Sequence, residues 1–232
     1  MSNIPSEIYA IILDYIEYPY KFSLSCKLFN ELVRKNVVPS DEQIIYSFKR
    51  KYPLSTIKQI ISNTKSNLAV KDNFPINICV LYNWIDAIKL LISDDRVDPS
   101  NAINRAMRMG HFDITSLLIN HPKLKEVDLY NAISFGHYKL VKHFLNHPKV
   151  TISTQLLRDA VINSQYKIVE LLLSHPKIDP NDYQLIYYAV ITNKPEILKL
   201  LLSDVRIKVN DVSVLLQFAI NHGYHDIIAL LM

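Results

Sequence analysis

Apolar, small and turn-forming residues recur at one spacing through residues 76–232. Each copy has an apolar residue, then a small residue three positions later, then a turn-forming residue four positions after that. The apolar positions are Ile76, Ile103, Leu129, Leu157, Ile186 and Leu216. The small positions are Cys79, Ala106, Ala132, Ala160, Ala189 and Ala219. The turn positions, 26 to 30 residues apart, are Asn83, Gly110, Gly136, Ser164, Asn193 and Gly223.

This spacing predicts two short helices in each copy. Residues three apart, such as Leu129 and Ala132, share one helix face, and Gly136 permits the left-handed backbone that ends a helix. An apolar stripe that includes Leu140 and Phe144 follows at helical spacing. Neither segment is long enough to be stable alone in water. The pattern therefore predicts an all-α fold, a helical-repeat solenoid whose copies depend on their neighbours.

These copies resemble the ankyrin repeat. Leu129-Tyr130-Asn131-Ala132 followed by Gly136-His137 is similar to the family's Leu-x-x-Ala and Gly-His, as are Ile103 to Ala106 and Gly110-His111. The resemblance covers residues 73–232 as six copies, the last of which ends at its second helix. The copies are shorter than the family's usual length of about 33 residues and lack its Thr-Pro. We therefore expect shortened repeats with clipped or irregular β-hairpin fingers.

The ankyrin resemblance also implies a binding face, because the exposed positions of the family's first helices line a concave surface. Arginine at one end of this set and aromatic residues at the other suit a protein interface. The alternative is that each of these side chains only faces water. The positions are Arg105, Arg108, Asn131, Ser134, Asp159, Ile162, Tyr188, Ile191 and Phe218.

Residues 1–40 do not follow the repeat spacing. Their apolar residues predict a helical hairpin, which resembles the F-box through Ile4-Pro5-Ser6-Glu7-Ile8 and Cys26-Lys27-Leu28-Phe29-Asn30. That family docks such a hairpin onto the Skp-type adaptor subunit of cullin-RING ubiquitin ligases. By position, the resemblance implies a contact surface made of Ile4, Pro5, Ile8, Ile12 and Ile16. The alternative is that the hairpin only caps the repeats.

The segment 41–72 joins the hairpin to the repeats. Ile45, Ile57 and Ile60 follow the repeat spacing, but this interpretation puts Phe48 at the small-residue position. We therefore interpret the segment as a degenerate starting repeat that makes a rigid link.

Composition narrows the classes of protein that the chain can represent. Its 232 residues are 49% hydrophobic and 21% charged, with a net charge of +4, which favours an ordered protein without a basic stripe for nucleic acid. No apolar run is long enough to span a membrane, and the start lacks signal-peptide features. We interpret Cys26 and Cys79 as reduced core thiols. These features predict a cytoplasmic protein.

Few residues are candidates for a metal site, a cofactor site or a catalytic site. His121-Pro122-Lys123, His147-Pro148-Lys149 and His175-Pro176-Lys177 occupy one position of three copies. Stacked copies lie about 10 Å apart, whereas zinc ligands need bonds of about 2 Å, so we expect no metal site there. We expect Asp94 and Asp95 to be solvated. The sequence contains no Gly-rich phosphate loop and no Cys-x-x-Cys, so we predict no cofactor and no enzyme activity.

The two resemblances together imply a substrate-recruiting adaptor, in which the hairpin engages a ubiquitin-ligase core and the repeats hold a target protein. The same combination resembles proteins of large DNA viruses of amoebae, which would place the protein in host cytoplasm. A plain scaffold or inhibitor without a ligase role is the alternative. A third possibility is an enzyme subunit whose partner carries the chemistry.

Overall fold

The computed structural model describes residues 40–63, 66–209 and 212–232. The described part of the chain is all-helical, with only an isolated bridge between Val127 and Val150 in place of strands. The helices are α3 (Asp41–Lys49), α4 (Leu54–Ser62), α5 (Val70–Leu81), α6 (Ile85–Leu91), α7 (Ser100–Met109), α8 (Phe112–Ile119), α9 (Tyr130–Ser134), α10 (Tyr138–Phe144), α11 (Thr154–Ile162), α12 (Tyr166–Leu173), α13 (Tyr183–Ile191), α14 (Pro195–Leu202), α15 (Ser213–His222) and α16 (His225–Leu231). The all-α prediction is confirmed for these residues. The predicted hairpin of residues 1–40 lies outside them, apart from Ser40.

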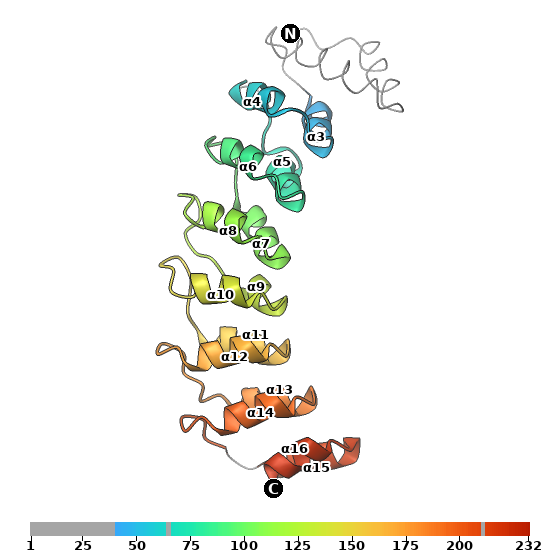
Figure 1. Ribbon diagram of the computed structural model, residues 1–232, viewed down its shortest axis with the longest axis vertical. Coiled ribbons are helices and arrows are strands. Elements are labelled where there is room, and N and C mark those ends of the chain that lie inside the picture. The colour runs from blue at the N-terminus through green and yellow to red at the C-terminus, as the bar shows by residue number, and fades with distance from the viewer. Residues whose placement is uncertain (1–39, 64–65, 210–211) are drawn as a thin grey trace. The chain divides into compact units, whose positions relative to one another are not determined.

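The described residues divide into two compact units, the first made of residues up to Arg105 with Asp113–Lys123 and the second of Ala106–Phe112 with Leu124–Met232. In the second unit the first helices α9, α11, α13 and α15 pack against one another in succession. The second helices α10, α12, α14 and α16 form a parallel layer in the same order (Figure 1). In the first unit α3 packs on α5 and α4 packs on α6. Both units therefore have the two-layer helical-repeat arrangement that the sequence predicts.

Each first helix ends in the same hydrogen-bonded turn. In α9, Gly136 N–H donates to the Ile133 carbonyl at 3.0 Å and His137 N–H donates to the Ala132 carbonyl at 2.8 Å. This is the Schellman arrangement, which needs a left-handed residue just after the helix. All six predicted turn residues have φ between 51° and 72°. The predicted turn positions are therefore confirmed, including those where Asn or Ser replaces Gly.

A seventh turn of this kind follows α3. Lys51 has φ 49°, and Tyr52 N–H donates to the Ser47 carbonyl at 3.0 Å. Ser47 is thus the small residue of this copy, and the prediction that Phe48 takes that position was wrong by one residue. The error arises because this copy has one more residue, Pro53, between its turn and its second helix than the later copies have. The α3–α4 pair has the repeat geometry.

The small positions form the core between first helices. Cys79 and the five alanines at the equivalent positions are fully buried, which lets neighbouring helices approach closely. The second helices contribute a buried stripe such as Leu140, Val141 and Phe144. Burial of one such side chain contributes about 1.5–3 kcal/mol, and here that burial depends on the next copy.

The inter-repeat fingers are short, as the sequence predicts. Val127 N–H donates to the Lys149 carbonyl at 2.8 Å, and this is the contact behind the isolated bridge. Pro122, Pro148 and Pro176 lie just after α8, α10 and α12, where they prevent continuation of the helix. No described helix has the length and apolar character to cross a membrane.

Candidate functional site: a helix face and the loops that position it

The exposed side chains of α9, α11, α13 and α15 make one surface of the second unit, which we call the first-helix face. Of the predicted binding residues, Asn131, Ser134, Tyr188 and Phe218 lie half-buried on these helices. Arg108 is exposed on α7, whereas Arg105 is half-buried and belongs to the first unit. Two further positions in this unit differ from each other, since Ile162 is exposed and Ile191 is half-buried.

Sequence reasoning missed exposed aromatic residues of the first-helix face. Tyr130 is 47% exposed and Tyr187 is 41% exposed, and both lie one residue before the predicted binding position of their copy. Phe135, just before the turn of its copy, is also exposed. A signal was present in the sequence, because two copies carry tyrosine at the same place. The ankyrin pattern instead predicted the residue that follows each tyrosine as the binding position.

The first-helix face is almost uncharged. In α9, α11, α13 and α15, Arg158 and Asp159 are the only charged side chains apart from histidine. The second helices of the same unit differ, with charges at Lys139, Lys142, Lys167, Glu170, Glu196, Lys199 and Asp226. Aromatic residues with few charges are typical of the buried centre of protein interfaces.

Asp159 departs from its predicted exposure. The sequence predicts a solvent-facing residue, but Asp159 is only 8% exposed. Its carboxylate accepts a hydrogen bond from Gln155 Nε2 at 2.7 Å. The pKa of Asp159 is raised by burial, which the Gln155 hydrogen bond only partly offsets. A single carboxylate thus lies within the otherwise nearly uncharged face.

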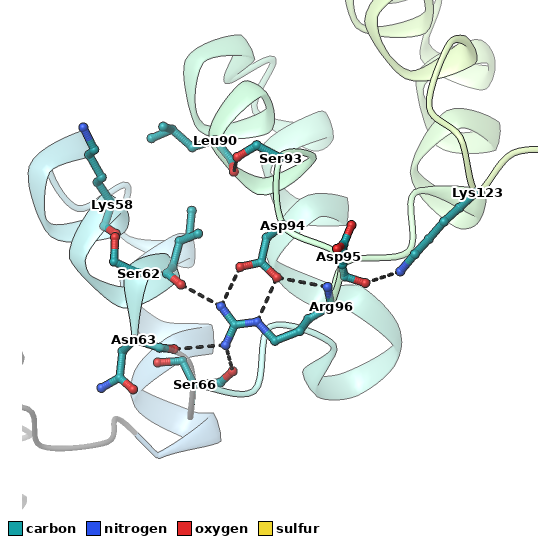
Figure 2. A network of polar contacts seen from close by, with 11 residues as sticks. Lys58, Ser62, Asn63, Ser66, Leu90, Ser93, Asp94, Asp95, Arg96 and Lys123 are labelled. Atoms are coloured by element: carbon teal, nitrogen blue, oxygen red, sulfur yellow. Dashed lines mark hydrogen bonds and ion pairs between the residues drawn. The ribbon is translucent and has the colours of Figure 1, made fainter.

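The loops after the second helices hold neighbouring copies together. In the first unit, Arg96 donates to the carbonyls of Ile61 at 2.6 Å, Asn63 at 3.0 Å and Ser66 at 2.9 Å, all from the preceding copy (Figure 2). The Asp94 carboxylate accepts two hydrogen bonds from this guanidinium, at 2.8 and 2.6 Å. These bonds lower the pKa of Asp94. The expectation that Asp94 is solvated was therefore wrong, because the carboxylate pairs with Arg96.

Five loops occupy the same repeat position: Asp94-Asp95-Arg96, His121-Pro122-Lys123, His147-Pro148-Lys149, His175-Pro176-Lys177 and Asp204-Val205-Arg206. In each loop the side chain of the first residue accepts the backbone N–H of the third, at 2.9 to 3.3 Å. The third residue is always a cation. Arg206 donates to the Leu173 carbonyl at 2.6 Å, and Lys123 donates to the Asp95 and Val97 carbonyls. Aspartate and histidine thus form the same local hydrogen bond, and Arg96, Lys123 and Arg206 connect their loops to the preceding copy.

The three histidines of these loops form the same local hydrogen bond, and His121 and His175 also contact the preceding copy. Nδ1 of each imidazole accepts the backbone N–H of the lysine, so it carries no proton. Nε2 then holds the proton, and it lies 3.2 Å from the Ile92 carbonyl in His121 and 3.0 Å from Asn146 Oδ1 in His175. Burial lowers the pKa of His147, and the nearby Lys149 lowers it further. In the second unit, the loops at His175 and Arg206 therefore link copies that carry the first-helix face.

Comparison with known proteins supports the repeat assignment. Residues 129–213, which include α9 to α14, match the family model for ankyrin repeats in three copies. This confirms the ankyrin prediction for the third to fifth copies. No match to a curated protein or to a solved structure was found. Ankyrin repeats are protein-binding modules, so the matched residues indicate a role in protein–protein interaction.

Proposed function

We propose that the chain is a protein-binding adaptor whose first-helix face holds a target protein. The observation that carries this proposal is the charge depletion of that face together with its exposed tyrosines. Tyrosine supplies a large contact area at low conformational cost, and amide side chains supply adaptable hydrogen bonds. Exposed glutamines, one on each of α11, α13 and α15, accompany the tyrosines on this face: Gln155, Gln184 and Gln217. This composition is typical of a recognition surface.

The second helices provide an internal control. Tyr166 on α12 is 41% exposed, as is Tyr187 on α13, but Tyr166 belongs to the charged layer. We expect Tyr130→Ser with Tyr187→Ser to weaken capture of a partner from the cells that express the protein. Tyr166→Ser should leave capture unchanged. Equal effects of the two changes would argue against the first-helix face as the binding surface.

The adaptor function further includes a ligase contact through residues 1–40. This part of the proposal rests on the F-box resemblance of Ile4-Pro5 and Cys26 to Asn30. A pull-down with a purified Skp-type subunit tests it, with the Ile8→Asp, Ile12→Asp double variant as the comparison. Capture by the natural chain and loss in the variant support a ligase adaptor, provided that both retain the helicity of the repeats. No capture by the folded natural chain would favour a scaffold or inhibitor.

A further inference from the structure

Asp159 is a charged group in the first-helix face without a cationic partner of its own. Among the described residues no lysine or arginine forms an ion pair with it. Its hydrogen bond comes from the neutral Gln155. Burial raises the pKa of Asp159 and the negative charge of Asp128 adds to this rise, which the Gln155 hydrogen bond and the positive charge of Arg158 offset only in part. The site therefore disfavours the carboxylate in the free protein, and a cation brought by a partner would stabilise it.

Arg158 precedes Asp159 in the chain but is already engaged elsewhere. Its Nη2 lies 2.7 Å from Asp182 Oδ2, and its Nε donates to the same oxygen at 3.2 Å. Its Nη1 donates to Gln155 Oε1 at 3.1 Å. The charge of Arg158 is thus paired with Asp182, and Gln155 is oriented so that its amide points its N–H group at Asp159. The network leaves a positioned carboxylate with capacity for another donor.

Tyrosines lie on α13, one of the helices that pack against α11, which carries this carboxylate. Tyr188 occupies the position equivalent to Asp159 on the adjacent helix α13. Its ring lies 5.4 Å from that of Tyr187 at an angle of 70°. A guanidinium group can pair with a carboxylate through two parallel hydrogen bonds and can also lie over an aromatic ring. A carboxylate on one helix with tyrosines on the helix packed against it therefore complements arginine better than it complements an acidic or purely apolar side chain.

We propose that the partner of the first-helix face is a protein segment that places an arginine side chain on Asp159, beside Tyr187 and Tyr188. This inference rests on the proposed binding function of that face and adds the chemistry of the partner. The guanidinium would replace or join the Gln155 donor. The apolar and amide-bearing positions around it would accommodate the uncharged remainder of the segment.

The test uses the whole chain, isotopically labelled, and the peptide acetyl-Gly-Arg-Gly-amide, followed by NMR titration. The same peptide with citrulline, which is neutral and nearly isosteric with arginine, is the ligand control. We expect resonances of Gln155 and Asp159 to shift with the arginine peptide. Its affinity should exceed that of the citrulline peptide about tenfold or more. The carboxyl resonance of Asp159 should also titrate at lower pH when the arginine peptide is bound.

Two variants separate this inference from general charge attraction. Asp159→Asn should abolish the arginine preference, whereas Glu170→Gln on α12 removes the same charge from the second-helix layer and should preserve it. Equal binding of the two peptides, an unaffected arginine preference in Asp159→Asn, or shifts confined to the second helices would overturn the inference. If partner capture depends on Tyr130 and Tyr187 but is unchanged in Asp159→Asn, the arginine inference is overturned while the adaptor function stands. Binding of the arginine peptide without capture of a partner protein would instead support the arginine site and contradict the adaptor function.

Discussion

The imidazole of His137 lies directly against Gly110, the turn residue of the preceding copy. A Cβ atom on Gly110 would lie 2.7 Å from Cε1 and Nδ1 of that ring. His137 Nε2 is 2.8 Å from the Arg108 carbonyl oxygen, two residues before the glycine. The contact links successive turns in the second unit. Glycine at this position thus provides both the left-handed backbone, with φ 72°, and the space for the ring.

Replacing Gly110 with alanine should therefore destabilise the protein more than replacing Gly223 does. Gly223 has φ 68°, but a Cβ atom added to it would meet no atom within 4 Å, so Gly223→Ala carries only the backbone cost of about 1–2 kcal/mol. Gly110→Ala adds the clash with His137, roughly 1–3 kcal/mol more. Urea unfolding measures both. Equal losses, or no relief when His137→Ala is combined with Gly110→Ala, would contradict this explanation.

Arg96 should contribute more to stability than an ordinary surface arginine. Arg96→Met removes hydrogen bonds to three backbone carbonyls of the preceding copy and leaves those acceptors without their charged donor. The expected loss of unfolding free energy is roughly 1–3 kcal/mol. Because Asp94 orients the guanidinium, a double-mutant cycle with Asp94→Asn should show coupling between the two residues. Strictly additive effects would mean that the carboxylate does not position Arg96.

The loop that contains His147 should make stability depend on pH below neutrality. The pKa of His147 in the folded protein lies below its ordinary value, so folding favours the neutral ring. The contribution of His147 to the free energy of unfolding is fully present above the unfolded-state pKa of about 6.5. It is lost as pH falls through the folded-state pKa. A protonated Nδ1 can no longer accept the Lys149 N–H.

The chain itself suggests the control for this pH dependence, because Asp94 and Asp204 each accept the backbone N–H of an arginine at the equivalent position. His147→Asp with Lys149→Arg rebuilds that loop type around position 147. We expect the variant to lose less unfolding free energy than the natural chain between pH 7 and pH 5. Parallel stability curves for the two proteins would show that His147 does not contribute to the pH dependence.

Cys79 should be unreactive in the folded protein. It is fully buried at a small-residue position, and burial raises the pKa of its thiol far above the usual range. In a Cys26→Ser background, a thiol reagent at pH 8 should label Cys79 only after denaturant is added. Labelling at the same rate in native buffer would show that the α5 core opens readily.

The helix ends were predictable from sequence because one residue decides each of them. Gly110, Gly136 and Gly223 mark left-handed turns by their identity, and the even spacing extends the assignment to Asn83, Ser164 and Asn193. The start of the repeats was harder. The additional Pro53 shifts the second-helix apolar pattern by one residue relative to the turn, so alignment on Ile57 and Ile60 places Phe48 where the structure has Ser47.

Contacts that cross between copies were beyond sequence reasoning. Arg96 and Ile61 are 35 residues apart, and neither residue type indicates that a guanidinium reaches that carbonyl. The burial of Asp159 has a similar origin. Its exposure depends on the side chains packed around it, including Gln155, and not on its place in the repeat.

Site-specific photo-crosslinking tests the central claim, that the first-helix face binds a protein partner, most directly. A benzophenone amino acid replaces Tyr187 in one sample and Tyr166 in another, two tyrosines with equal exposure in different helix layers. The proteins are irradiated in extracts of the cells that express the chain. We predict a discrete crosslinked partner from position 187 and none from position 166. The same crosslinks from both positions, or crosslinks from position 166 alone, would contradict the account.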